Sequence, residues 1–492
     1  MDILSGMSPR CCAQSAVLLL AFLPLLAADP FDPVREFIRK GLVETGMPSI
    51  SVAVAKNGEI VWEEGFGWAD REKRIKATEH TMYSLASISK PFTATGLMVL
   101  VQQGKLDLDH AVNNYLGNAI IRTRVGDGAQ ATVRRLANHS SGLPLHVQFF
   151  YSDTSRRPPS MDETILRYGN LVTAPGERFQ YSNLGFGILD YIIERISRKS
   201  YADFMREQVF IPLGLTRTSV HIGPGLESFA STRYGRDSLP VAFYEFDHTG
   251  ASAVWSSAHD LARFGMFHLK AHLPDQKAIL SDEWINAMQK PTFPSGKNVG
   301  YGIAWVVTDT AGGYRTISHN GAMHGVATTL RLVPSEKLAV IVLCNGSDQL
   351  PHQVADEIFK VMLPNWRQPE RPSDSHPVYT VPSQLKGAWN GQIITYKQDL
   401  PLTLRLLDSH EVHAQLGDQK KVLVNDPRWE DGYFSGEFIG NLGTEDTGPG
   451  PVQIRLLLKL RGDKLNGSAT ATALPGMRGG FNLTHWVDLK RE

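Results

Sequence analysis

The sequence predicts an α+β domain, an antiparallel sheet with a helical insertion, followed by a small antiparallel β-barrel or sandwich. Two observations lead to this fold class. Strand-like apolar runs lie near both ends of the region 31–365, whereas helix-like stretches dominate between about residues 130 and 290. After a proline-rich segment at 367–382, short strand-like runs recur with turns between them.

The first 28 residues have the pattern of a signal peptide. A short polar segment ends at Arg10, the run 16–26 is almost purely apolar, and Ala27-Ala28 provides small residues for cleavage. The apolar run is short for a membrane-spanning helix, so we expect an exported protein, periplasmic or secreted, with no membrane span in the mature chain. An uncleaved membrane anchor is the alternative.

Local signals predict the elements of the first domain. Asp32 can cap a helix that has Pro33 at its first position, and Gly104 ends a helical pattern that begins at Ser87. Asn-Gly at 57–58 joins two apolar runs and is a hairpin signal. Cys344 ends an apolar run and is expected to be a small core residue. The expected strands are 50–55, 59–68, 314–318, 326–333 and 338–343, and a closing helix is expected at 354–363.

The second domain is expected to consist of short strands. Its candidates are 391–396, 400–406, 412–415, 433–438, 452–460 and 481–488. The predicted organisation is therefore a leader at 1–28, a first domain at 29–366, a linker at 367–382 and a second domain at 383–492.

Composition and missing motifs exclude several classes of function. The 492 residues carry 50 Lys and Arg against 50 Asp and Glu. Nucleic-acid binders usually need a basic surplus, so we expect no nucleic-acid partner. The sequence has no P-loop, G-x-S-x-G or H-E-x-x-H motif. His268 and His272 lie four residues apart without an evident third ligand, so we interpret them as packing or solvated histidines and predict no metal and no cofactor.

The first candidate for chemistry is the S-x-x-K sequence from Ser87 to Lys90. Residues three apart on a helix share a face, so Lys90 would lie beside the Ser87 hydroxyl and could take its proton if burial keeps the amine neutral. Pro91 is compatible with the first turn of a helix, where free backbone N–H groups favour a developing oxyanion. The same pattern recurs at Ser383 to Lys386 without a helix, so one match alone is weak evidence.

The second candidate is Tyr181-Ser182-Asn183, between a turn at 175–177 and an apolar helix expected over 184–196. A tyrosine at this junction can point into a cleft, and its phenol can relay a proton if nearby cations depress its pKa. Asn183 would supply an amide to hold a substrate carbonyl. A half-buried packing tyrosine is the alternative interpretation of Tyr181.

The third candidate is His319-Asn320-Gly321, which stands at the end of an expected strand and precedes Ala322. Glycine there would let a substrate backbone approach the strand edge closely. A histidine that only marks a strand boundary is the alternative, and a similar triplet occurs in a loop at 248–250.

Taken in chain order, S-x-x-K, Y-x-N and H-x-G resemble the motif set of the serine penicillin-recognising family. That family includes class C β-lactamases, D-alanyl-D-alanine carboxypeptidases, D-aminopeptidases and related esterases. Segments 83–86 (YSLA), 136–143 (LANHSSGL) and 255–264 (WSSAHDLARF) are also similar to it. The resemblance covers about residues 31–365 and implies a β-lactamase/penicillin-binding-protein-like transpeptidase fold. The C-terminal segment, which opens with GAWNG at 387–391, resembles the lipocalin-like barrels appended to some of these hydrolases.

The resemblance implies roles for the motif residues. Ser87 would be the acylated nucleophile, and Lys90 and Tyr181 the general base and acid. The backbone N–H groups of Ser87 and Ala322 would form the oxyanion hole. The residues that bind the substrate would be Asn183, His319, Asn320 and Gly321.

His319 departs from the lysine that β-lactamases and carboxypeptidases usually carry. Lysine can pair with a substrate carboxylate, whereas a histidine with an ordinary pKa near ~6.5 is mostly neutral at pH 7. We therefore expect an exported serine hydrolase whose small-molecule or peptide substrate is an ester or a D-amino-acid amide. The alternatives are a β-lactamase or D-alanyl-D-alanine carboxypeptidase, and a non-catalytic penicillin-binding-like scaffold. The barrel would bind an apolar ligand, shape the cleft or serve only as a packing accessory.

Overall fold

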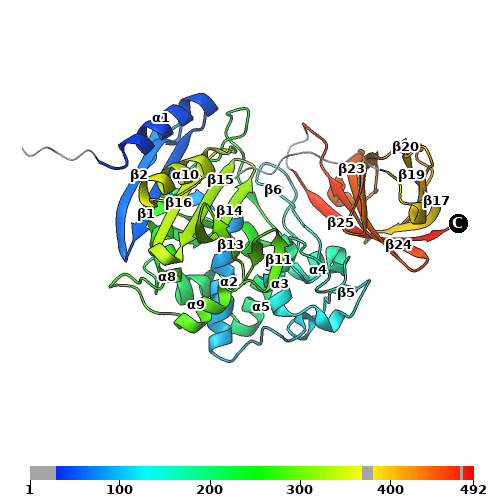
Figure 1. Cartoon of the computed structure of the whole chain (residues 1–492), viewed down its shortest axis with the longest axis horizontal. Coiled ribbons are helices and arrows are strands. Elements are labelled where there is room, and N and C mark those ends of the chain that lie inside the picture. Colours follow the sequence, from blue (N-terminus) through cyan, green and yellow to red (C-terminus); the bar gives the residue numbers. More distant parts are fainter. Residues whose placement is uncertain (1–28, 368–379, 477–479) are drawn as a thin grey trace, which may run out of the picture.

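The computed structural model describes residues 29–367, 380–476 and 480–492. The expected leader lies outside these residues, as does most of the expected linker. The described chain forms a larger α+β body and a smaller β body beside it, drawn in blue to yellow and in yellow to red in Figure 1. No helix within the described ranges is long and apolar enough to cross a membrane.

The larger body is built on an antiparallel sheet to which both ends of the region contribute. β1 pairs with β2 through the Asn57-Gly58 turn on one side and with β16 on the other, so the first and last strands meet at the centre. Alternating and continuous apolar runs explain these strands, and β1 is buried on both faces. Within the described residues the sheet has nine strands, in the order β11 (Phe293–Gly296), β12 (Val299–Tyr301), β13 (Val306–Ala311), β14 (Tyr314–Met323), β15 (Val326–Val333), β16 (Leu338–Cys344), β1 (Ser49–Lys56), β2 (Glu59–Asp70) and β3 (Ile75–Lys76).

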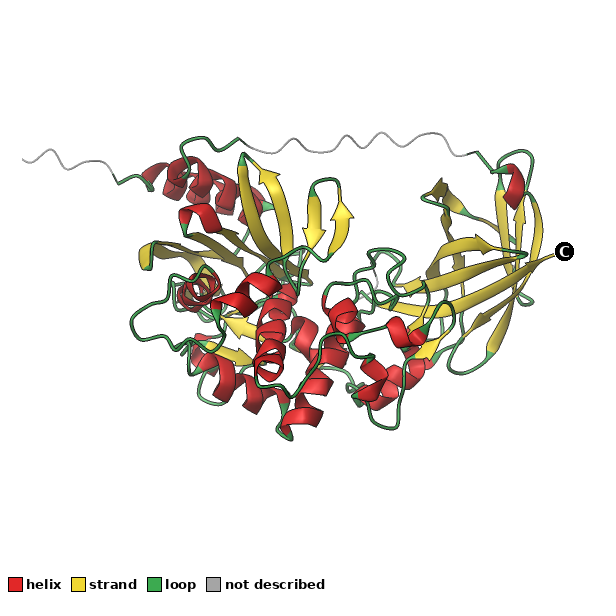
Figure 2. Cartoon of the chain, turned by 60° about the horizontal axis from the view of Figure 1, so that its bottom comes forward, coloured by secondary structure: helices red, strands yellow, loops and turns green. Residues whose placement is uncertain are grey.

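Helices cover both faces of this sheet (Figure 2). α1 (Asp32–Thr45) and α10 (Leu350–Met362) pack on one face, where Val52 and Val340 belong to their apolar cluster. The helical insertion packs on the other face and buries the opposite side of the same strands. The insertion contains α2 (Ser89–Gln102), α3 (Val133–Ala137), α4 (Met161–Tyr168), α5 (Asn183–Ser197), α6 (Tyr201–Met205), α7 (Thr249–Ser252), α8 (Ala258–His268) and α9 (Asp282–Met288).

Short strands tie the insertion together. β10 (Val254–Ser256) lies between β4 (Tyr83–Ser84) and β8 (Thr218–Val220), and it holds the segment that leads into α2. The remaining pairs are β5 (Arg122–Thr123) with β7 (Asn170–Leu171) and β6 (Phe150–Tyr151) with β9 (Tyr244–Glu245).

The C-terminal body is a nearly closed antiparallel barrel. Inward-facing residues alternate along strands such as β23, and the edge strand β20 contacts β22, the neighbour of the other edge strand β21. The strands follow the order β20 (Val422–Leu423), β19 (Val412–Leu416), β18 (Asp399–Leu406), β17 (Gly387–Ile394), β25 (Asn482–Arg491), β24 (Lys464–Thr472), β23 (Val452–Arg461), β22 (Tyr433–Gly440) and β21 (Asn425–Glu430).

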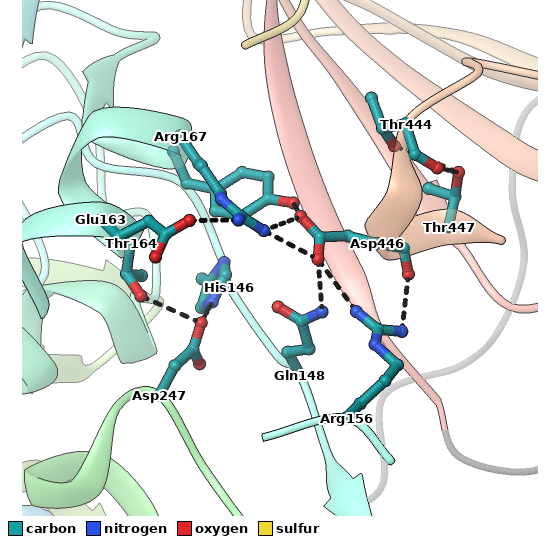
Figure 3. Close-up of polar contacts among 11 residues, drawn as sticks. His146, Gln148, Arg156, Glu163, Thr164, Arg167, Asp247, Thr444, Asp446 and Thr447 are labelled. Carbon is teal, nitrogen blue, oxygen red and sulfur yellow. Dashed lines mark hydrogen bonds and ion pairs between the residues drawn. The ribbon is translucent and has the colours of Figure 1, made fainter. Parts of the chain in front are cut away.

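A buried carboxylate of the barrel anchors it to the larger body on the side of α4. Asp446 is 5% exposed and accepts hydrogen bonds from Arg156 and Arg167, each at 2.9 Å, and from Gln148 at 3.2 Å (Figure 3). Tyr168 at the end of α4 donates to the same carboxylate. Four donors on one buried charge make a specific contact, because a buried carboxylate must be paired to remain ionised.

The predicted elements need several corrections. Asp32 does not cap α1, because the helix begins at that residue after Phe31, and Asp29 instead accepts the Phe31 N–H at 2.9 Å. The strand expected at 314–318 continues to Met323, so His319 lies inside it rather than at its end. β24 was not predicted, because its alanines, threonines and glycine give little hydrophobic signal even though much of the strand is buried. Cys344 is a buried core residue, as predicted.

Candidate active site

Ser87 lies in a single 3-10 turn, Ala86–Ile88, that leads directly into α2. The prediction that Ser87 stands near the N-terminus of a helix is therefore confirmed. Ala86 has φ of 49°, in the left-handed region that alanine rarely adopts. Such strain persists only where the surroundings enforce it, and it sets the direction in which the next side chain points.

Gly321 explains how the turn is held against the sheet. A Cβ atom at this position would lie 2.1 Å from the Leu85 carbonyl oxygen and 2.2 Å from Thr328 Oγ1. Thr328 donates a hydrogen bond to that carbonyl at 3.0 Å, which locks the start of the turn onto β15. The glycine of the H-x-G motif thus serves the close approach of the Ser87 turn, whereas the sequence suggested the approach of a substrate.

Lys90 is completely buried, and its Nζ has three partners. It lies 3.1 Å from Ser87 Oγ, 2.8 Å from Asn183 Oδ1 and 3.1 Å from the Ala251 carbonyl. Burial holds the pKa of Lys90 well below its usual value. A neutral amine has two protons and one lone pair, and the two carbonyl oxygens can only accept. The protons therefore go to Asn183 and Ala251, and the lone pair faces the Ser87 hydroxyl.

Asn183 begins α5 and is fixed at both ends of its amide. Its Nδ2 donates to the His146 carbonyl at 2.8 Å, which leaves Oδ1 toward Lys90. Ser182 caps the helix, and its Oγ accepts the Gly185 N–H at 3.0 Å. The amide thus orients the amine directly, a contact that the sequence did not predict.

Tyr181 lies over the same group. Lys90 Nζ is 4.7 Å from its ring centre, and the ring of His139 packs beside it at 4.2 Å. Burial raises the pKa of Tyr181 well above its ordinary value, an effect that a hydrogen bond to Ser87 only partly offsets. The phenol pKa depressed by cations that the sequence suggested is therefore wrong for this site, because burial of the phenol dominates its pKa.

His319 is buried and bonded at both ring nitrogens. Nδ1 lies 2.8 Å from the Asn320 carbonyl and must donate to it, so Nε2 accepts from the Tyr301 hydroxyl, also at 2.8 Å. Burial lowers the pKa of His319 to about 3. The expected absence of a fixed cation at this position is therefore reinforced, since the ring stays neutral far below pH 7.

Tyr301 and His139 are site residues that the sequence reasoning missed. Tyr301 joins His319 to the cleft wall, and His139 accepts the Ser182 N–H at Nδ1 at 3.1 Å. His139 has φ of 62° and a pKa held well below its usual range by burial. His139 stands within the segment 136–143 (LANHSSGL), whose similarity to the family could have identified it as a site residue. No motif in the sequence around Tyr301 pointed to a role in the site.

The cleft opens from Ser87 into two lobes. A smaller lobe of about 420 Å³ is lined by Tyr181, Tyr301, His319, Asn320 and Ala322, among others. A larger lobe of about 1310 Å³ runs between the two bodies and reaches Asn482 of the barrel. β14 pairs with β13 only as far as Ser318, so its edge from 319 to 323 borders the cleft.

The structure therefore brings the predicted residues of all three motifs together. The second occurrences of the same patterns, at 383–386, 168–170 and 248–250, have other surroundings. Ser383 is exposed at the start of the barrel, and Tyr168 binds Asp446 at the interface. His248 binds Asp247 instead of facing Ser87. His268 packs against Phe264 and Trp305 and is fully buried, which fits a packing role rather than a solvated one.

One cluster in the described part of the chain has a composition that could hold a metal ion: His146, Asp247 and His248. His146 Nε2 and His248 Nδ1 each lie 2.8 Å from a different oxygen of Asp247. Burial would raise the pKa of Asp247, but the two histidines more than offset this and lower it. Each imidazole thus already satisfies one carboxylate oxygen, as in a buried hydrogen-bonded triad.

Comparison with known proteins gives consistent matches over this body. Residues 34–361 match the family described as Beta-lactamase. Penicillin-binding protein 4* of Bacillus subtilis (strain 168) is 27% identical over 356 residues, which cover 66% of this chain and 74% of that relative. Protein flp of Staphylococcus aureus (strain NCTC 8325 / PS 47) is 27% identical over 342 residues, which cover 67% of this chain and 66% of that relative.

Solved structures share the fold. The octameric penicillin-binding protein homologue from Pyrococcus abyssi superposes with a TM-score of 0.59 at 23% identity, over 92% of this chain and 99% of that one, so the similarity extends into the barrel. The β-lactamase/D-alanine carboxypeptidase from Pseudomonas syringae gives 0.58 at 20% identity, over 66% of this chain and 97% of that one.

Proposed function

The chain belongs to the beta-lactamase family, and on that premise we propose that it is an exported serine hydrolase that acts through a Ser87 acyl-enzyme on an ester or a D-amino-acid amide. The observation that carries this proposal is the position of the Lys90 amine. Its amine is buried and lies 3.1 Å from Ser87 Oγ, 2.8 Å from Asn183 Oδ1 and 3.1 Å from the Ala251 carbonyl. In the neutral amine, the two protons go to the two carbonyl oxygens and the lone pair faces Ser87. A neutral amine in that position is a base for the serine proton.

In the acylation step, Lys90 takes the Ser87 proton while Oγ attacks the substrate carbonyl. The negative charge that develops on the carbonyl oxygen is stabilised by the backbone N–H groups of Ser87 and Ala322, which both line the cleft. Removing one such donor costs on the order of 10²–10³ in rate in other enzymes.

Tyr181 is the acid for the leaving group. Its phenol is protonated at neutral pH because burial raises its pKa, so it can give a proton to the departing alcohol or amine. The proton taken by Lys90 then restores the phenol. In the deacylation step a water molecule gives a proton to the pair Lys90 and Tyr181 and attacks the acyl carbonyl. Ser87 Oγ is the leaving group and takes the proton back from this pair.

The preference for esters and D-amino-acid amides rests on His319. A carboxylate in the smaller lobe would meet a neutral ring whose two nitrogens already have partners. The described residues that line this lobe include no lysine or arginine. A substrate that depends on pairing its carboxylate in the smaller lobe, such as a β-lactam or a D-alanyl-D-alanine peptide, would lack that partner there.

The test offers the purified protein a short-chain nitrophenyl ester, a D-amino-acid nitroanilide and a chromogenic cephalosporin. We expect the ester or the anilide to be hydrolysed faster than the cephalosporin, and Ser87→Ala to abolish turnover. Ser383→Ala is the matched control, since it removes the serine of the second S-x-x-K sequence at an exposed position. Cephalosporin turnover well above the others would favour the β-lactamase alternative. Equal activity in wild type and Ser87→Ala would remove Ser87 as nucleophile.

A further inference from the structure

The barrel makes a second charged contact with the larger body, at the turn that precedes Tyr181. Glu177 stands in this turn, and its carboxylate accepts hydrogen bonds from two barrel residues on β23, Lys459 and Arg461, the latter at 2.8 Å. The Ala174 N–H also donates to it at 3.0 Å. Burial would raise the pKa of Glu177, but these contacts outweigh it and lower the pKa to about 2. The turn therefore ends on a permanent, partly buried charge held by the barrel.

The contact continues along the loop into the active site. The next residue, Arg178, lies 4.5 Å from the ring centre of Tyr433 on β22, and Lys459 lies 5.1 Å from the same ring. Phe179 then packs against Tyr301 in the smaller lobe at 5.4 Å. Three residues separate Glu177, the charge held by the barrel, from Tyr181, the phenol that covers Lys90. The Gln180 N–H is bonded to the His139 carbonyl at 2.7 Å.

Strand β25 of the barrel also contacts the segment 145–147, which binds the Asn183 amide. Val147 and Asn482 exchange backbone hydrogen bonds at 3.0 and 2.9 Å, and Thr484 Oγ1 donates to the Leu145 carbonyl at 3.1 Å. His146, between these two contacts, offers its carbonyl to Asn183 Nδ2. The barrel thus borders both segments that position the groups around Lys90.

We propose that the C-terminal barrel is a positioning element of the active site, which holds the Tyr181 loop through the contact of Lys459 and Arg461 with Glu177. This inference rests on the proposed function for its catalytic consequence, but the geometry of the loop is independent of the substrate. The Asp446 cluster docks the barrel (Figure 3), whereas the Glu177 contact acts on the loop that carries the phenol.

The test changes the barrel side of the contact, because Lys459 and Arg461 line neither lobe of the cleft. Lys459→Glu places two carboxylates together and should release the loop. We expect kcat to fall about tenfold to a hundredfold while KM stays within about twofold, because misplacing a group by ~1 Å can cost ~10² in rate. Lys459→Arg keeps the positive charge and should retain the wild-type kcat.

The matched control is Arg156→Gln, which removes the two hydrogen bonds of Arg156 to Asp446 without touching the Tyr181 loop. It should leave kcat near the wild-type value. A wild-type kcat in Lys459→Glu, or an equal loss in Arg156→Gln, would overturn the proposal.

A readout without substrate separates this proposal from the proposed function. Hydrogen–deuterium exchange of the segment 174–182 should rise in Lys459→Glu and stay at the wild-type level in Arg156→Gln. If the wild type hydrolyses none of the substrates, the proposed function fails while this exchange difference still tests the positioning role. Unchanged exchange in Lys459→Glu would refute it.

Discussion

Replacing Gly321 by alanine perturbs the nucleophile without changing a catalytic side chain. The new Cβ would lie 2.1 Å from the Leu85 carbonyl oxygen, and real Cβ contacts hardly ever fall below 3.0 Å. The turn that carries Ser87 must therefore retreat from β14 by about 1 Å. A displacement of ~1 Å at the reacting atoms costs on the order of 10² in rate, so we expect kcat/KM on a nitrophenyl ester to fall about a hundredfold.

Gly65→Ala is the matched control for the effect on folding. Its Cβ would lie 2.4 Å from Thr78 Cα and 2.5 Å from the Ala77 carbonyl oxygen, a comparable collision on β2, four strands away from β14 in the sheet. Both variants should lose stability in thermal unfolding, but only Gly321→Ala should lose most of its activity per folded molecule. If Gly321→Ala keeps wild-type kcat/KM, the close approach of the turn to β14 does not set the position of Ser87.

Three further outcomes follow from the charges of the site and the core. Asn183→Asp puts a carboxylate 2.8 Å from Lys90 Nζ and raises its pKa, so the acid limb of the kcat/KM profile should move up by about 1–3 pH units; an unchanged limb would argue against the amine as base. His319→Lys should raise the kcat/KM ratio of carboxylate-bearing over neutral esters by roughly tenfold, the effect of a charge-assisted contact of about 1.5 kcal/mol, and an unchanged ratio would contradict the role given to the neutral ring. Burial lowers the pKa of His268 to about 3, and the unfolded chain, with a pKa near ~6.5, takes up this proton first as the pH falls. The contribution of His268 to the free energy of unfolding is therefore fully present above pH ~6.5 and decreases toward pH ~3. Between pH 7 and 5, the free energy of unfolding measured in urea should fall by about 2 kcal/mol less in His268→Gln than in wild type. Equal decreases would show that His268 is not the group that causes the loss.

Much of the site followed from the sequence because its motifs are local. Ser87 and Lys90 share one turn of chain, so their contact needs only the helix that Pro91 and the apolar run predict. The Y-x-N motif could be placed at the start of a helix for the same reason. The H-x-G motif was placed at a strand end but lies within β14, and only the order of the three motifs matched a family.

The remainder depends on contacts between distant segments. Whether a tyrosine has a raised or lowered pKa depends on its surroundings, and here burial of the phenol raises the pKa of Tyr181 where the sequence suggested a lowered one. The partner of His319 is Tyr301, which lies on another strand and has no motif around it. The position of Glu177 against Lys459 brings together residues of two domains, and spacing along the chain carries no information on that contact.

Mass spectrometry of the intact protein during turnover tests the acyl-enzyme most directly. Acid quenching during hydrolysis of a slow nitrophenyl ester should trap a species heavier by one acyl group, with the added mass on the peptide that contains Ser87. Ser383→Ala should give the same adduct, and Ser87→Ala should give none. Turnover without any adduct on Ser87, or an adduct that persists in Ser87→Ala, would contradict an acyl-enzyme on Ser87.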